Sequence, residues 1–316
     1  MKNFVLISFV ILAFGKLSFD SPWPDNARGT EISDMDYGQK RPGKLPVLFS
    51  PEYIKTKHRI HSSPAFSPDL SEVYWSIFPR TSDIKHKKET ILFSKKVDKK
   101  WTKPEVVSFS GKYTDGGPLF SSNGNRLYFY SRRPLNNRSK SETKGEIWFV
   151  EKQDEGWGEP KHLKIDFKGE KYFFSISKNN NLYFTSGHGP GGSGRGLVDI
   201  YCARFVNGSY TKPERLPDDI NSIQFVESDP LISPDEKYLI FYSFENPENF
   251  GQYDLFISYN TGNNDWTKSQ NLGEQINTGY SRFPRFSPDG RYLFFVKTDG
   301  IYWIDCSVIY DLVKTE

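Results

Sequence analysis

The chain of 316 residues contains the stretch Pro284-Arg-Phe-Ser-Pro-Asp-Gly-Arg-Tyr-Leu-Phe-Phe295 near its C-terminal end. Related phrases begin at Pro64, Pro118, Phe174 and Pro230, so successive copies start 54, 56, 56 and 54 residues apart. A period of this size is typical of repeat proteins, whose units cannot bury their apolar faces alone and must stack on one another. The repeat is therefore the strongest evidence for the fold.

Each phrase predicts a β-hairpin. A short strand ends at the serine, Pro-Asp-Gly or a variant of it makes a tight turn, and an aromatic-rich strand follows. A third strand is expected further on in each unit, over Thr90–Ser94, Glu146–Val150, Asp199–Ala203, Asp254–Ser258 and Gly300–Ile304. A fourth segment begins with an aromatic residue, usually with proline three residues later: Trp101/Pro104, Trp157/Pro160, Tyr210/Pro213 and Trp266, with Ser269 in the proline's place. Proline in a strand belongs at a sheet edge, so this segment is the outer strand of a four-stranded antiparallel propeller blade.

We expect an all-β protein, a five-bladed β-propeller whose last blade is closed by an N-terminal strand. After Gly300–Ile304 the chain ends too soon for a fourth strand and a further blade, whereas Arg41–Phe49 reads as a fourth strand without its own blade. Pairing these two segments would seal the ring and remove two exposed sheet edges. A sixth blade would have to come from residues 16–44, which lack the pattern. The propeller is thus expected over residues 41–310, after an N-terminal extension at 16–40 and before a tail at 311–316.

The N-terminus predicts a secretory signal peptide over residues 1–15. Met1-Lys-Asn3 is a basic start, Phe4–Leu12 is a short apolar run, and Ala13 and Gly15 are small residues at the positions that precede a cleavage site. The apolar run is too short to favour a membrane-spanning helix, so no transmembrane segment is expected after cleavage. A retained anchor is the alternative interpretation.

Composition and cysteine content narrow the function classes. The net charge is only +3, and no basic cluster dominates, so nucleic-acid binding is not expected. The two cysteines, Cys202 and Cys306, fall in the third and fifth repeats, too far apart for a disulfide. Neither has the neighbouring Cys or His of a zinc site, so no metal site is assigned to them.

Two stretches carry a resemblance to a known family. Ser287-Pro-Asp-Gly-Arg-Tyr-Leu293, preceded by Asn271-Leu-Gly-Glu-Gln-Ile-Asn-Thr278, resembles the WD40-like (PD40) propeller repeat of TolB-like periplasmic proteins. The glycine-rich run Ser186–Gly196 is similar to the loop that such repeats carry between their second and third strands. The resemblance covers residues 41–308 and implies a periplasmic or secreted propeller used for protein–protein contact. The chain departs from fused members in leaving no room for a peptidoglycan-binding domain, and from TolB in lacking an N-terminal domain and in its blade count.

Candidate binding residues follow from their offset to the repeat serine, because inner strands of a propeller line a central channel. Six residues before the serine stand His61, Asp115, Lys171, Glu227 and Ser281, and four residues before it stand Ser63, Gly117, Phe173, Asp229 and Phe283. The set predicted to bind a ligand at the channel mouth is His61, Asp115, Glu170, Lys171, Glu227, Asp229 and Arg282. These side chains would recognise a peptide or sugar, or hold a cation such as calcium through carboxylates. Alternatively, they only cap the inner strands.

We therefore expect a non-catalytic protein-binding or scaffolding module of the cell envelope, monomeric and without a cofactor. Its partner would be an envelope or secreted protein, or a peptide or glycan ligand, and no catalytic residue is assigned. The alternative is a carbohydrate-active hydrolase, since Asp115 and Glu227 lie on inner strands two blades apart and glycosidases use paired carboxyls. A serine hydrolase is not favoured, because His188 lies in a glycine-rich loop and no serine stands in a Gly-x-Ser-x-Gly elbow.

Overall fold

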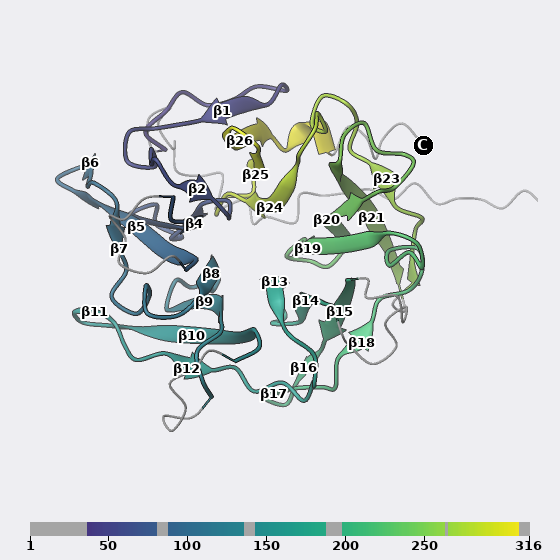
Figure 1. The fold of residues 1–316 in the computed structure, drawn as a ribbon, viewed down its shortest axis with the longest axis horizontal. Helices are drawn as coiled ribbons and strands as arrows, with labels where there is room; N and C mark the ends of the chain where they lie inside the picture. Colours follow the sequence, from purple (N-terminus) through teal and green to yellow (C-terminus); the bar gives the residue numbers. More distant parts are fainter. Residues whose placement is uncertain (1–36, 81–87, 136–142, 188–197, 263–264, 310–316) are drawn as a thin grey trace, which may run out of the picture.

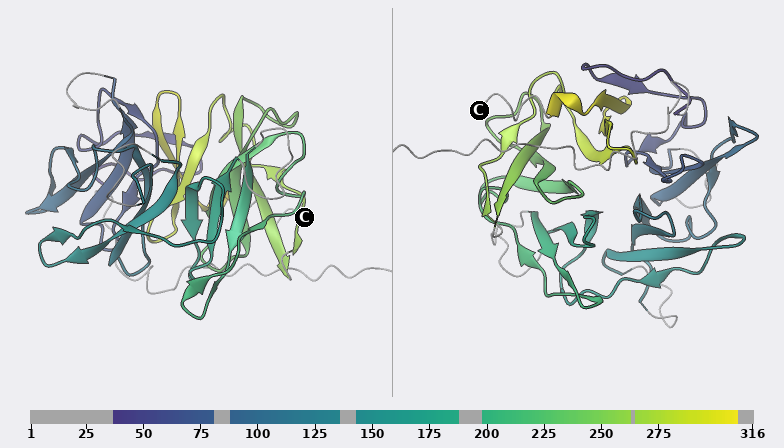
Figure 2. Two further views of the ribbon diagram at one scale, coloured as in Figure 1. Left: turned by 60° about the horizontal axis from the view of Figure 1, so that its bottom comes forward. Right: turned by 180° about the vertical axis from the view of Figure 1, so that it is seen from behind.

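The computed structural model describes residues 37–80, 88–135, 143–187, 198–262 and 265–309. Five antiparallel sheets stand around a common axis as the blades of a β-propeller (Figure 1), which confirms the predicted fold class. The view from behind shows the same ring of blades (Figure 2, right). The predicted signal peptide at 1–15, the tail at 311–316 and most of the glycine-rich run Ser186–Gly196 lie outside the described residues.

The strands of the blades follow the repeat. The inner strands are β2 (Arg59–Ile60) with β3 (Ala65–Phe66), β8 (Asp115–Phe120), β13 (Tyr172–Ile176), β19 (Val226–Ile232) and β24 (Arg282–Phe286). The second strands are β4 (Glu72–Phe78), β9 (Arg126–Ser131), β14 (Leu182–Ser186), β20 (Tyr238–Phe244) and β25 (Tyr292–Lys297). The third strands are β5 (Thr90–Val97), β10 (Glu146–Gln153), β15 (Asp199–Ala203), β21 (Tyr253–Gly262) and β26 (Gly300–Asp305). The outer strands are β7 (Glu105–Val106), β12 (Lys161–His162), β18 (Glu214–Arg215), β23 (Gln270–Asn271) and β1 (Val47–Phe49).

The repeat serine and aspartate build the turn between inner and second strands. In the fifth repeat the Ser287 hydroxyl donates to Asp289 and accepts the Tyr292 amide at 3.0 Å, while the Gly290 amide donates to the Ser287 carbonyl at 2.9 Å. A short side chain that bonds the backbone locally stabilises a tight turn. The third repeat has no aspartate here, and the Ser177 hydroxyl donates instead to Glu236 of the neighbouring blade at 2.9 Å.

The outer strands begin later than the aromatic residues indicated. Trp101 ends a short strand, β6 (Lys100–Trp101), that pairs with the far end of β5, and the outer strand β7 starts only after Pro104. Three further short strands, β11 (Gly156–Trp157), β17 (Ser209–Tyr210) and β22 (Asp265–Trp266), likewise precede their outer strands, and β17 pairs with β16 (Phe205–Val206). In three of the blades a proline, which has no N–H for the ladder, stands between the two pieces, and in the fourth blade Ser269 stands there.

The N-terminal strand completes the fifth blade as predicted. β1 pairs antiparallel with β26, with Val47 opposite Trp303 and Phe49 opposite Ile301. Phe49 is buried, with its ring 5.0 Å from that of Trp303. Tyr37, within the segment assigned to the extension, is also fully buried, 5.0 Å from the ring of Phe66 in the first blade. Both ends of the chain therefore contribute to one core between the first and last blades.

The described residues contain no helix long and apolar enough to cross a membrane. Cys202 lies on β15 and Cys306 directly follows β26, and both are buried free thiols. Burial raises the pKa of Cys202 to about 11, so its thiol stays protonated and unreactive.

Closure by β1 can be tested with two residues of that strand. Phe49→Ala leaves a cavity against Trp303, and it should lower the free energy of unfolding by about 3–5 kcal/mol. Leu48→Ala is the matched control, because Leu48 is 43% exposed and should change that energy by less than about 0.5 kcal/mol. Urea unfolding measures both. Equal losses in the two variants would contradict a sealing role for the buried face of β1.

Candidate functional site

Four of the five inner strands carry a bulge near their start. The pairing with the second strand shifts register within β8, β13, β19 and β24, always four residues before the repeat serine. Gly117, Phe173, Asp229 and Phe283 occupy these positions with φ of +57°, +41°, +55° and +55°. Left-handed φ is costly for residues other than glycine, and a bulge re-aims its side chain.

Aromatic side chains meet across the channel at this end. The rings of Phe173 and Phe283, from the third and fifth blades, lie 5.2 Å apart. The His61 ring of the first blade lies 4.9 Å from Phe283, and Tyr130 of the second blade lies 5.7 Å from Phe173. Four blades thus contribute to a cluster of rings at the strand-start end of the channel, His61, Tyr130, Phe173 and Phe283, which we call the aromatic plug.

The fourth blade joins the plug through an ion pair. Arg282 Nε and Nη2 donate to the Asp229 carboxylate at 3.1 and 3.3 Å, and the same carboxylate accepts the Phe283 amide at 3.1 Å. The guanidinium stands over aromatic rings, 4.4 Å from the centre of Phe283 and 4.5 Å from that of Tyr242. Asp229 and Arg282 therefore both contact Phe283 of the plug, and their charges are already paired with each other.

Asp115 and Glu170 pair with arginines of the second blade. The buried Asp115 accepts Arg133 Nη2 at 2.8 Å and the Ser110 hydroxyl at 3.0 Å. Burial raises the pKa of Asp115, against the opposing effect of Arg133. Glu170 is partly exposed and lies 3.5 Å from Arg132 Nη2.

Lys171 points away from the channel. Its Nζ is fully buried, donating to Glu146 Oε2 at 2.8 Å and to the carbonyls of Phe167 and Gly169 at 3.0 and 3.2 Å. Burial lowers the pKa of Lys171, and the Glu146 carboxylate opposes that effect. Lys171 thus links the second and third blades. All three of its N–H donors have acceptors within the protein, so none is left for a ligand.

His61 is held by a glutamate that the repeat did not reveal. His61 Nδ1 lies 2.8 Å from Oε1 of the fully buried Glu89, which also accepts the Ser76 hydroxyl at 2.7 Å. Gly116 makes room for this carboxylate, since a Cβ there would stand 2.1 Å from Glu89 Oε1. The other Glu89 oxygen, Oε2, is buried without a hydrogen-bond partner among the described residues.

Glu227 is buried with neutral partners. Its oxygens accept the Ser222 amide at 3.0 Å and the Ser243 hydroxyl at 3.1 Å. Burial raises the pKa of Glu227 to about 8, because removing a carboxylate from water disfavours its charged form. The side chain is therefore protonated at neutral pH in the folded protein.

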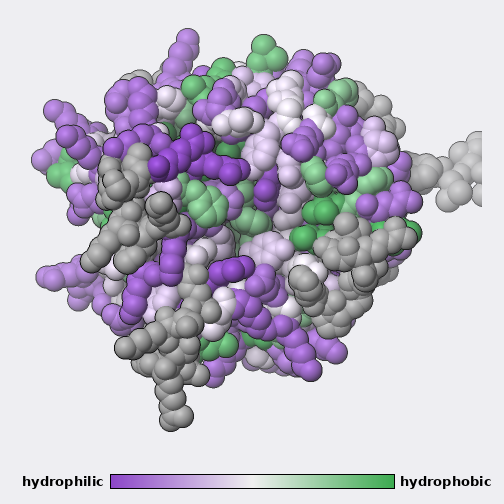
Figure 3. Space-filling view, in the orientation of Figure 1, coloured by the Kyte–Doolittle hydropathy of each residue, from purple (hydrophilic) through white to green (hydrophobic). Residues whose placement is uncertain are grey.

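The seven predicted residues all lie at the strand-start end, but they do not form one ring of groups facing a ligand. Asp229 and Arg282 meet each other, and the other five are held by different partners. Their role in ligand binding stays a prediction. Sequence offsets missed the partners, Arg133, Glu146 and Glu89, because these stand on second and third strands or follow them. Figure 3 shows one face of the ring, largely hydrophilic with small groups of hydrophobic residues.

A cavity of about 440 Å³ lies beside the plug, and we call it the mouth pocket. It is lined from the first three blades and includes two carboxylates, Glu89 and Glu170, with Arg132 and Tyr130 between them. In the parts of the chain that the structure describes, no three His, Cys, Asp or Glu side chains gather as a metal-binding group. A cation in the channel therefore stays an untested alternative, and no metal ligands are assigned.

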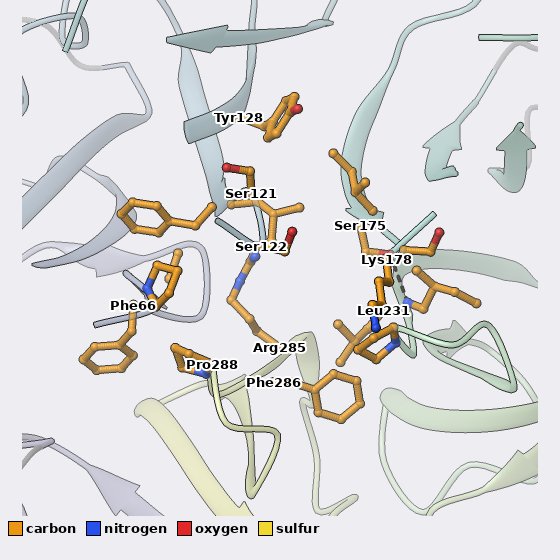
Figure 4. Close-up of a pocket in the computed structure, with 18 of the residues that line it drawn as sticks. Phe66, Ser121, Ser122, Tyr128, Ser175, Lys178, Leu231, Arg285, Phe286 and Pro288 are labelled. Carbon is orange, nitrogen blue, oxygen red and sulfur yellow. Dashed lines mark hydrogen bonds between the residues drawn. The ribbon is translucent and has the colours of Figure 1, made fainter. Parts of the chain in front are cut away.

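A second cavity, of about 360 Å³, lies at the opposite end of the channel (Figure 4). We call it the turn pocket, because the turns that follow the repeat serines surround it. All five blades line it, with Phe66, Leu119, Ser175, Leu231 and Arg285 among the contributors. The walls are mainly apolar, and no aspartate or glutamate is among the lining residues.

The turn pocket also corresponds to a single offset in the repeat. Two residues before the repeat serine stand Ala65, Leu119, Ser175, Leu231 and Arg285, and all five line the pocket. The sequence itself shows this difference, because Arg285 is charged whereas the four other residues at this offset are small or aliphatic. Arg285 is thus the residue that distinguishes the pocket chemically.

Comparison with known proteins gives the fold and little more. One solved structure, described as a glycoside hydrolase, is 11% identical, with a TM-score of 0.51 over 83% of this chain and 90% of that chain. Putative TolB from Agrobacterium tumefaciens is 18% identical, with a TM-score of 0.49 over 76% of this chain and 70% of that chain. A GH74 enzyme from Niastella koreensis is 15% identical, with a TM-score of 0.43 over 77% and 44%. No family model matches the chain, and no curated protein matches it.

The protonated state of Glu227 predicts a pH dependence of stability. In the folded protein the Glu227 carboxyl keeps its proton up to about pH 8. In the unfolded chain a glutamate loses this proton near pH 4.3. Stability should therefore fall as pH rises through this window, by at most about 1.4 kcal/mol per pH unit from this group, and level off above it. Urea unfolding of the protein and of Glu227→Gln at several pH values isolates the effect as the difference between them. Parallel curves for the two proteins would contradict the assignment.

Proposed function

We propose that this chain is a non-catalytic binding or scaffolding module that holds its partner at the turn pocket. The observation that carries the proposal is the asymmetry of the channel. At one end the rings of the aromatic plug meet, beside the mouth pocket, which only the first three blades line. At the other end all five blades line a mainly apolar cavity of about 360 Å³ without a carboxylate. Cavities of this size, apolar with a few polar groups, are typical ligand sites.

The distribution of carboxylates supports binding over catalysis. Glycoside hydrolysis requires two carboxyl groups about 5–10 Å apart that face the substrate. The turn pocket has no carboxylate among its lining residues. At the strand-start end, Asp115 and Asp229 are paired with arginines, and Glu227 is buried against serines.

The proposal includes the location that the N-terminal pattern indicates, secreted or periplasmic, with a partner in the cell envelope. A secreted protein, peptide or glycan would fit the same pocket from outside the ring. A monomer suffices for this role, because the five blades of one chain complete the pocket.

A carbohydrate-active hydrolase remains the second candidate, favoured by one observation. Glu89 and Glu170 both line the mouth pocket, and Glu89 Oε2 has no hydrogen-bond partner among the described residues. If this pocket is catalytic, release of reducing sugar from glycans will be measurable, and Glu89→Gln and Glu170→Gln will each abolish it.

Capture of a partner from envelope extract tests the proposed function. Ser122 is exposed on a turn at the rim of the turn pocket, so Ser122→Trp should block the pocket without disturbing the core. Glu170→Ala alters the opposite end and serves as the matched control. We expect the unchanged protein and Glu170→Ala to capture the same partner in similar amounts. Ser122→Trp should capture at least tenfold less of it, as measured by quantitative mass spectrometry. A partner held equally by Ser122→Trp, or lost only with Glu170→Ala, would contradict recognition at the turn pocket.

A further inference from the structure

Two arginines three residues apart on β24 have opposite surroundings. Arg282 is bound by the Asp229 carboxylate and covered by aromatic rings. Arg285 lines the turn pocket, and no hydrogen bond, ion pair or aromatic contact holds it within the described part of the chain. Its Nε atom is buried and lacks an acceptor. The same strand thus carries one satisfied cation and one without a counterion.

The Arg285 side chain is half-buried, and within it the Nε atom is enclosed without an acceptor. Burial lowers the pKa of Arg285 to about 10, with no neighbouring carboxylate to raise it. A buried charged group without a partner is unfavourable, and the pocket lining has no acidic residue that could move to it. The corresponding positions of the other blades are Ala65, Leu119, Ser175 and Leu231, so the layer itself does not require a charge.

Neighbouring side chains supply further hydrogen-bond donors. Arg285 extends from the fifth blade toward the second-blade turn that carries Ser121 and Ser122 (Figure 4). The Ser175 hydroxyl accepts the Ile232 amide at 2.9 Å, which leaves its own proton free to be donated to a ligand. Lys178 adds a second positive charge to the lining. The polar residues of the lining are thus two cations, hydroxyl-bearing residues and Asn180, with no carboxylate among them. Cations and hydroxyl donors are the groups that bind an anionic oxygen.

The rest of the wall limits what can carry the anion. The larger lining side chains are apolar: Phe66, Leu119, Phe120, Leu231 and Phe286. A strongly hydrated inorganic ion would leave these surfaces facing water, whereas an apolar body would bury them. A planar carboxylate matches the fork of the guanidinium with two parallel hydrogen bonds.

We propose that the turn pocket binds the carboxylate of an apolar organic acid, with Arg285 as its counterion. The inference rests on the proposed function and names the chemistry of the group that the pocket recognises. Two sources offer this chemistry: a free acid with an apolar body, or the C-terminal residue of a partner chain with an apolar side chain. In both, the body packs against the aromatic and aliphatic wall while the carboxylate meets Arg285.

Calorimetric titration of the full chain tests the inference with matched probes. Decanoate represents the free acid, and acetyl-Ala-Ala-Phe with a free or an amidated C-terminus represents the peptide. At least one of the two acids, decanoate or the peptide with a free C-terminus, should bind. The affinity of the amidated peptide should be at least tenfold lower than that of the peptide with a free C-terminus. Arg285→Met should weaken the acid at least tenfold, and Arg285→Lys should weaken it less because the charge is kept. Arg59→Met, an exposed arginine on β2 at the other end of the channel, should bind unchanged.

The ligand-free proteins give a second readout. Arg285→Met removes a cation without a counterion, so its melting temperature should rise above that of the unchanged protein, as expected where stability is traded for function. A structural role for Arg285 would lower that temperature instead, and this result would count against the inference.

The outcomes separate this inference from the proposed function. Whichever acid binds more tightly identifies the source of the carboxylate. If the acid and the amide bind equally and Ser122→Trp blocks both, the pocket is a binding site but the carboxylate assignment is wrong. Binding of neither acid, or equal binding by Arg285→Met, also overturns the inference, whereas capture of a partner from extract still decides the proposed function.

Discussion

The five inner strands run in the same direction along one axis, so residues at the same offset from the repeat serine stand at the same level of the channel. At the offset of six, polar side chains such as Asp115 and Glu227 bond within their own blades. At the offset of four, left-handed bulges aim Phe173 and Phe283 across the axis. At the offset of two, the side chains line an open pocket. The chemistry of each level is thus set by five residues that a 54–56-residue period places together.

The repeat was sufficient to predict the blades, because a serine-proline-aspartate turn followed by an aromatic strand is a local signal. It was sufficient for ring closure too, since Arg41–Phe49 had an outer-strand pattern and no blade of its own, and β1 pairs with β26. The outer strands begin later in the chain than the aromatic residues predict, because each of these aromatic residues belongs to a separate short strand. The sequence pattern does not reveal Glu89 and Arg133 as partners of inner-strand residues, because Glu89 directly precedes β5 and Arg133 follows β9, both outside the repeat phrase.

Charge pairing explains why the two ends of the channel differ. At the strand-start end, charges come with partners: Arg282 with Asp229, Arg133 with Asp115, and Lys171 with Glu146. The Arg282–Asp229 pair holds Phe283 of the aromatic plug, and the other two pairs hold buried side chains of the second and third blades. A residue so held is poorly suited to exchange its partner for a ligand. At the turn end the lining contains only cations among its charged groups. This difference in charge pairing is the reason why we propose the turn end, and not the strand-start end, as the place for a ligand.

Anomalous diffraction from a crystal soaked in bromide would test this asymmetry most directly. The ion is a small anion that needs no knowledge of the natural ligand. We predict a bromide peak beside Arg285 in the turn pocket and none beside Arg282, whose guanidinium is already bound by Asp229. An Arg285 guanidinium bonded to a carboxylate of the protein, with no bromide in the pocket, would contradict the assignment of this end as the binding site.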